Sequence, residues 1–290
     1  MAELFDRRVR VVIHRLEITG LRVAFHASRS LRKAPNTCEV RIWGLNRDHQ
    51  RQLQEQKAIP MRLEAGYAVP PLGGAAAAAL EAIGLISAAD TQLPVLFDGD
   101  LRHAFTSREG GDLITTITGG DGEKKGQQQR VKLSYRPGLR WRKMIADLAK
   151  GAGVGVGNAL SALGSLSDLE FTTGAAMSGS SLDQLDHLLQ SQGFEMSVQN
   201  GELQVLGSGG ALRGVAVELS EGSGLVDSPE PGNDGKVKVR ALLQPGLEPG
   251  RLVKLASERV SGIYRVEKWD AVGDTHAQDW HAELEVGEAA

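Results

Sequence analysis

The C-terminal third of the chain carries the pattern that decides the fold. Residues 224–255 read GLVDSPEPGNDGKVKVRALLQPGLEPGRLVKL, and residues 262–284 read GIYRVEKWDAVGDTHAQDWHAEL. Runs of alternating apolar and polar residues are separated there by Pro, Gly, Asn and Asp; the runs are Lys236 to Leu243, Arg251 to Leu255, Gly262 to Trp269 and Asp279 to Val286. This pattern is typical of a small antiparallel β-structure.

Length and composition favour several small β-rich domains. The 290 residues are enough for one large domain or for two to three small ones, each with its own core. With 41% hydrophobic residues, 24% charged residues and 36 glycines, the composition is globular and turn-rich. An all-helical architecture is therefore disfavoured.

The net charge excludes a general attraction to nucleic acid or to an anionic membrane. It is −3 at pH 7, so any such contact would have to be local. The best local candidate is the N-terminal group Arg7, Arg8, Arg10 and Arg15, but charges spaced along a strand usually form a solvated face. We expect no specific nucleic-acid binding.

Cysteine usage and hydropathy indicate a protein made for a reducing cytoplasm, without a membrane span. Cys38 is the single cysteine, so no intrachain disulfide can form, and the N-terminus lacks the apolar core of a secretory signal. The apolar segment Ala68 to Ala89 is too short as an uninterrupted run to span a bilayer. It is interrupted by Pro70, Pro71, Gly73, Gly74 and Glu81.

Residues 1–125 predict a first β-domain. Alternation from Arg8 to Ala27 predicts a hairpin with its turn at Thr19-Gly20. Asn46 can cap a short surface helix. The further expected elements are strands over Thr37 to Leu45, Met61 to Ala65, Val95 to His103 and Leu113 to Gly119, a helix over Arg47 to Gln56, and a turn at Gly110-Gly111-Asp112.

An Ala-rich insertion at about 68–94 interrupts this domain. Strong helix formers from Ala75 to Ala88 predict a helix that is nearly all apolar, so a partner should cover it. We therefore take Leu80, Ile83 and Leu85 as candidates for subunit contacts.

Three more residues complete the interface candidates. Trp43 lies on the opposite strand face from Val40 and Ile42, where it either anchors an interface or packs under a neighbouring loop. Trp269 is the second aromatic candidate. Arg130 ends a polar run that is either a plain loop or a segment that orders against a neighbour.

Residues 126–212 predict a small α/β module between two β-domains. Apolar spacing indicates a helix over Trp141 to Lys150 that ends at Gly151. A capping box with Ser181 as N-cap and Gln184 three residues later begins a second helix, which Gly193 ends. Asn200-Gly201 then predicts a hairpin. Residues 213–290 form the second β-domain.

No catalytic or cofactor-binding motif in the sequence has the neighbouring elements that its function would require. The run GAGVGVG at 151–157 follows a helix, whereas a phosphate loop needs a strand before it and a helix after it. His276, Asp279 and His281 could hold a metal ion, but polar residues at a β-turn explain them better. We therefore expect no enzyme activity, no cofactor and no metal.

Three stretches of the sequence resemble a known family. They are APNTCEVRIWGLN at 34–46 with RLEAGY at 62–67, LFDGDL at 96–101 with TTITGGDGE at 115–123, and GLVDSPEP, ALLQPGLEPGRLVKL and GIYRVEKWDAVGDTHAQDW in the last third. With them the chain resembles the baseplate hub proteins of contractile-tailed bacteriophages, the tail protein D or late control type of Mu-like phages. The Ala-rich insertion departs from the common pattern.

The resemblance implies a structural hub in the baseplate of the virion tail. It implies two tail-tube-like β-barrel domains per subunit and a homotrimer around a central channel. It also implies that the trimer joins the hexameric tail tube, or a distal tail adaptor protein, to a spike protein, with tape-measure and baseplate wedge proteins as further partners. If residues 250–252 and 264–266 pair in the second barrel, the first barrel must lie in 1–125. No catalytic residues are implied.

A second hypothesis remains open at this point. The α/β module and the acidic pairs of the sequence would also suit a peptidoglycan- or carbohydrate-binding tail-tip component with cell-wall activity.

Overall fold

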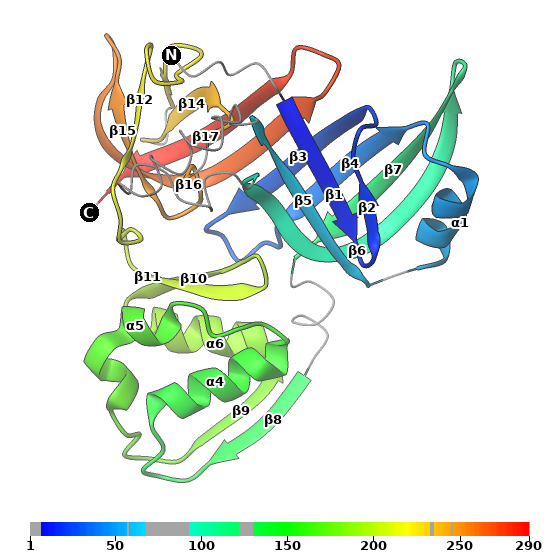
Figure 1. The fold of residues 1–290 in the computed structure, drawn as a ribbon. Helices are drawn as coiled ribbons and strands as arrows, with labels where there is room; N and C mark the ends of the chain where they lie inside the picture. The colour runs from blue at the N-terminus through cyan, green and yellow to red at the C-terminus, as the bar shows by residue number, and fades with distance from the viewer. Residues whose placement is uncertain are drawn as a thin grey trace, which may run out of the picture.

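The computed structural model of the chain describes residues 7–56, 58–67, 93–121, 130–232, 235–244 and 246–289. Strands predominate in this part, and a small group of helices lies on one side of them (Figure 1). The predicted mainly-β fold with a small α/β module is therefore confirmed.

The described residues of the N-terminal half form seven strands and one helix. They are β1 (Arg7–Ile13), β2 (Leu16–Ile18), β3 (Val23–Ser30), β4 (Thr37–Trp43), α1 (Arg47–Glu55), β5 (Pro60–Tyr67), β6 (Val95–Glu109) and β7 (Asp112–Gly120). The Asn46 side chain accepts a hydrogen bond from the His49 amide and so caps α1, as predicted. The turn at Gly110-Gly111 joins β6 to β7 in a long hairpin.

The predicted hairpin from Arg8 to Ala27 is wrong in its turn. The chain already reverses at His14, whose φ of 53° is left-handed, so β1 pairs with the three-residue β2. Gly20 makes a second turn, after which β3 pairs with β4 and not with β2. Val23, Phe25 and Ala27 point into the core, so burial of this face decides where β3 lies.

The C-terminal half contains the four strands that the opening stretch predicts, together with two short strands that it does not predict. The predicted strands are β14 (Val237–Leu242), β15 (Leu252–Ala256), β16 (Ser261–Asp274) and β17 (Trp280–Glu288), and the other two are β12 (Val217–Ser220) and β13 (Glu230–Pro231). Leu252 pairs with Arg265, and the Gly250 amide donates to the Val266 carbonyl, so the predicted pairing of 250–252 with 264–266 is confirmed.

The two halves share one sheet of 13 strands. Its order is β13-β14-β17-β16-β3-β4-β7-β6-β5-β1-β2, with β15 and β12 branching from β16. The halves meet where β3 pairs with β16, and they lie side by side in Figure 1. Buried residues of both halves form a single hydrophobic cluster. The division of the chain at 125 and 212, and the closure of each half into a barrel, stay predictions.

The middle module has its own hydrophobic core. Its elements are β8 (Arg130–Tyr135), α4 (Trp141–Ala152), α5 (Ala159–Leu163), the 3-10 helix η2 (Gly164–Asp168), β9 (Ala175–Ser180), α6 (Ser181–Gln190), β10 (Phe194–Gln199) and β11 (Glu202–Gly207). The helices lie between the β8–β9 pair and the β10–β11 hairpin, and this hairpin faces the large sheet (Figure 1). Asn200 and Gly201 form the predicted turn with φ values of 52° and 77°.

Three predicted helix ends are displaced. Helix α4 continues through Gly151 and ends at Gly153, which has a left-handed φ of 71°. Ser180 and not Ser181 caps α6, because the Ser180 hydroxyl accepts a hydrogen bond from the Asp183 amide; Ser181 is fully buried with its side chain beside Gly151. The helix ends at Gln190, before Gly193. The predicted helical insertion, with Leu80, Ile83 and Leu85, lies outside the described residues.

Gly273 lies where the two halves pack most closely. It pairs with Phe25 of β3 and with Trp280 of β17, whose rings contact each other edge-on at 5.4 Å between centroids. A Cβ on Gly273 would lie 2.4 Å from the Phe25 ring and 2.9 Å from the Trp280 ring. Both rings are buried and cannot easily move.

We expect Gly273→Ala to lower the free energy of unfolding by about 1–3 kcal/mol, because the added methyl group overpacks this contact. Gly207→Ala is the matched control, since a Cβ at this strand glycine meets nothing within 4 Å. Urea denaturation followed by tryptophan fluorescence measures both variants. If both variants lost the same unfolding free energy, the close contact at Gly273 would not be the cause.

Asp274 ties the turn between β16 and β17 to the start of β3. Its carboxylate accepts hydrogen bonds from Arg22 at 2.9 Å and from the His276 amide at 2.8 Å. Partial burial raises the pKa of Asp274, but these hydrogen bonds outweigh burial and leave the pKa below its usual value. The ionised form therefore stabilises the folded chain.

We expect Asp274→Asn to lower the free energy of unfolding by about 1 kcal/mol at pH 7. A carboxyl with a depressed folded pKa stabilises the fold above its unfolded pKa and loses this contribution as pH falls through the folded pKa. The difference from the unmodified protein should thus shrink between about pH 5 and pH 3. Asp279→Asn, at an exposed position of the same turn, is the control in denaturation curves across this range. If the difference in unfolding free energy between Asp274→Asn and the unmodified protein did not change with pH, the charge of Asp274 would not be its cause.

Candidate interaction surfaces

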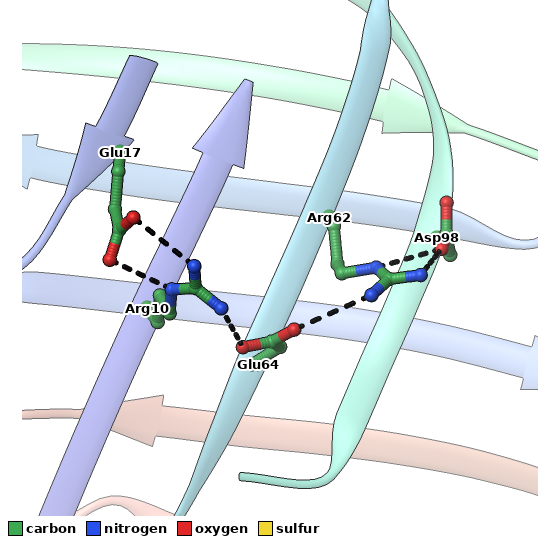
Figure 2. Close-up of polar contacts among 5 residues, drawn as sticks. All are labelled: Arg10, Glu17, Arg62, Glu64 and Asp98. Carbon is green, nitrogen blue, oxygen red and sulfur yellow. Dashed lines mark hydrogen bonds and ion pairs between the residues drawn. The ribbon is translucent and has the colours of Figure 1, made fainter. Parts of the chain in front are cut away.

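A ladder of alternating charges crosses four strands on the outer face of the N-terminal half. It consists of Glu17 on β2, Arg10 on β1, Glu64 and Arg62 on β5, and Asp98 on β6 (Figure 2). Arg10 contacts Glu17 at 2.8 Å and Glu64 at 3.1 Å. Arg62 donates to Asp98 at 2.8 Å and lies 3.7 Å from Glu64. Each cation therefore lies between two anions.

Glu64 is the centre of this charge ladder. It is only 8% exposed although it lies on the outer face, and it bridges the two guanidinium groups (Figure 2). The hydrogen bond from Arg10 lowers the pKa of Glu17 at the end of the ladder. Cross-strand ion pairs of this kind favour one strand register over another. The ladder fixes the last four strands of the sheet and offers a surface of alternating charge.

Trp43 lies half-buried on β4 between two arginines. The guanidinium of Arg22 is 4.2 Å from the ring centroid and that of Arg41 is 5.3 Å from it. Arg22 is held by Asp274, and Arg41 is held by Glu109 at 2.8 Å. Trp43 therefore packs against the guanidinium groups of Arg22, in the loop before β3, and Arg41, on β4. Its role as an interface anchor stays a prediction.

The middle module contacts the large sheet through polar groups. Arg29, which is 4% exposed, donates from Nε to the Gln199 side chain at 3.1 Å. Gln199 in turn donates to the Ser30 carbonyl at 2.7 Å, and Asn36 donates to the Val198 carbonyl at 2.8 Å. Burial lowers the pKa of Arg29, and the nearby acids Glu248 and Asp121 only partly offset it. We call this cluster the polar joint.

Two further contacts extend the polar joint. Asp121 accepts a hydrogen bond from the Gly201 amide at 3.0 Å, at the end of the β10–β11 hairpin. Burial raises the pKa of Asp121, although the hydrogen bonds from Gly201 and Asn36 act in the opposite direction. On the other side, Arg265 contacts Glu195 at 3.1 Å and donates to the Gly210 carbonyl at 3.0 Å. The hairpin is therefore held at both ends.

The glycine-rich run after α4 is occupied by the chain itself. Gly155 pairs with Glu202, and the Gly157 amide donates to the Glu202 carboxylate at 2.9 Å. A Cβ at Gly155 would lie 2.1 Å from this carboxylate, and one at Gly157 would lie 2.0 Å from the Leu203 carbonyl oxygen. Close packing against β11 thus explains these glycines, and the Glu202 carboxylate accepts the hydrogen bond that the Gly157 amide donates.

The polar residues of the tail make local contacts. His276 Nδ1 lies 2.9 Å from the Thr275 hydroxyl, and His281 lies 3.4 Å from Glu283. Among the described residues, no three His, Cys, Asp or Glu side chains are placed to hold a metal ion. In the same part of the chain, no helix is long and apolar enough to cross a membrane.

The two remaining interface candidates, Trp269 and Arg130, differ in their exposure to solvent. Trp269 is wrong as a surface contact, because it is 3% exposed and packs inside the core shared by both halves. Arg130 is exposed at the start of β8. The charge ladder and the polar joint were not predicted. Their members lie on strands far apart in sequence, so no local pattern could reveal them.

No family model matches the chain, and no curated protein matches it by sequence. Solved structures match it closely in fold. The 43 kDa tail protein of prophage MuSo2 from Shewanella oneidensis and a tail protein from Neisseria meningitidis each have 10% identity and a TM-score of 0.66. In both comparisons the match covers 98% of this chain and 97% of the other.

A further match is an Escherichia coli component of the type VI secretion system, described as similar to the phage T4 tail proteins gp27 and gp5. It has 7% identity and a TM-score of 0.58, over 97% of this chain and 77% of that one. At such low identity these matches concern the fold alone. From β1 to β17, the chain has the fold of phage tail proteins.

Proposed function

We propose that this protein is the structural baseplate hub of a phage tail. In this role three copies form a ring around a central channel and join the hexameric tail tube to a trimeric spike in the virion. The observation that carries the proposal is the match to two phage tail proteins over nearly their whole length, which includes both sheet halves and the middle module. The sequence motifs of the hub family support it independently.

The proposed partners follow from this role. They are two further copies of the chain, a tail tube or distal tail adaptor protein, and a spike protein, with tape-measure and wedge proteins as additional neighbours. A spike-type partner is supported by matches to structures of the Francisella PdpA–VgrG complex, with a TM-score of 0.58 in one of them. Rings form when one heterologous interface repeats around an axis. Trp43, Arg130 and the Ala-rich insertion are proposed contacts.

A structural role agrees with the chemistry of the described residues. The glycine-rich loop is filled by Glu202, and the tail histidines contact a hydroxyl and a carboxylate of the chain itself. No observation favours the peptidoglycan-binding alternative, and the same purified protein can test it.

We expect light scattering of the purified protein, alone and with its spike protein, to give a particle of three times the 31.0 kDa chain mass and a stable complex with the spike. Trp43→Ala should lower the trimer fraction, because a half-buried aromatic ring is a typical interface anchor. Val215→Ala is the control, since Val215 is 92% exposed in a connecting segment.

A protein that stays monomeric at all concentrations and binds neither spike nor tube would contradict the hub function. Release of muropeptides from purified peptidoglycan would instead favour the alternative. A Trp43→Ala protein with an unchanged trimer fraction would remove Trp43 from the interface and leave the hub function in place.

A further inference from the structure

The β8–β9 pair of the middle module has an open edge at β8. It has two strands, and within the described chain β8 pairs with β9 alone. No backbone hydrogen bond from the described residues reaches the outer edge of β8. An exposed edge of this kind is a template on which another extended segment can pair. Neither a proline nor a glycine interrupts the six residues of β8.

The outer face of this sheet is basic. Arg130 and Lys132 are exposed on β8, while the intervening Val131 and Leu133 pack towards the module core. Arg136 continues the series just beyond the strand. None of these three cations has an ion pair with the described residues, and we call them the basic strip.

The strand opposite the basic strip offers no compensating charge. Ser180 pairs with Arg130, and Ser178 pairs with Lys132. Arg130 and Lys132 thus face uncharged residues across the strand pair. Alternate residues of a strand are about 7 Å apart, so an extended peptide with acidic residues at alternate positions matches the spacing of the strip.

We propose that the outer edge of β8 binds an acidic, extended peptide segment of a partner protein, which adds to the β8–β9 pair as a third strand. Its backbone pairs with β8, and its carboxylates lie beside Arg130 and Lys132. An isologous pair of β8 with the β8 of a second copy is disfavoured, because it would bring cations together. A nucleic-acid strand is disfavoured because it has no backbone donors and acceptors that match a strand edge.

A fluorescent peptide with alternating Glu and Thr tests the proposal by anisotropy at low salt, with a Lys-Thr peptide of equal length as the control ligand. The full-length protein should bind the acidic peptide and not the basic one. The double change Arg130→Glu and Lys132→Glu should weaken binding by about tenfold or more, since two attractions become repulsions.

The matched control variant is Arg213→Glu with Arg259→Glu. These exposed arginines lie on other segments, and the double change alters the net charge equally. It should leave binding nearly unchanged. An equal loss in the two double variants would overturn the proposal, because it would show only a general charge effect. Circular dichroism verifies that both variants are folded.

Hydrogen exchange distinguishes strand addition from surface attraction. On binding the acidic peptide, amides within residues 130–135 should exchange more slowly, while those of residues 202–207 should not change. Unchanged exchange in β8 would overturn the strand-addition model. Tighter binding of a single-stranded oligonucleotide than of the acidic peptide would overturn the assignment of a peptide ligand.

Discussion

The pairing of β3 with β16 is the interaction on which the rest of the molecule depends. It aligns Ser30 with Lys268 at one end and Ala24 with Asp274 at the other, between segments some 240 residues apart in sequence. Because this pairing joins the two halves in one sheet, their inward faces bury a common core. Closing so long a loop is entropically costly, and the shared core offsets that cost. The edge-on contact of Phe25 with Trp280 lies in this core and explains why Gly273 must be small.

A bulge in β16 makes this arrangement possible. The register with β17 shifts between Val266 and Lys268, so Glu267 is the extra residue. Before the bulge β16 pairs with β15, and after it β16 pairs with β3. Bulges bend and twist strands, and here the bend lies where the strand changes partner. The Glu267 carbonyl accepts a hydrogen bond from the Leu31 amide, and its side chain contacts Lys236 and Arg265. The bulge thus also brings together the C-terminal half and the polar joint.

Local patterns in the sequence predicted the strands well and their partners poorly. The alternation in β14, β15 and β17 and the Asn200-Gly201 turn were correct, because each depends on neighbours in the chain. The reversal at His14 was missed, because a single histidine is a much weaker turn signal than an Asn-Gly pair, although both His14 and Asn200 are left-handed. The charge ladder and the burial of Trp269 depend on long-range pairing. Trp43 and Trp269 alternate with apolar neighbours in a similar way, and only the β3–β16 pairing buries the second.

The edge strands of the large sheet and of the β8–β9 pair differ in length and in proline content. The described large sheet ends in β2, β13 and, on its branch, β12, which have three, two and four residues, and β13 contains Pro231. Short strands and proline blunt an edge against pairing with other chains. The six-residue β8 has no such protection, and its sheet is held only by the core of the middle module. The polar joint holds this module against the large sheet through buried groups such as Arg29 and Gln199 on the side of the β10–β11 hairpin, so the β8 edge on the other side of the module points away from the large sheet (Figure 1).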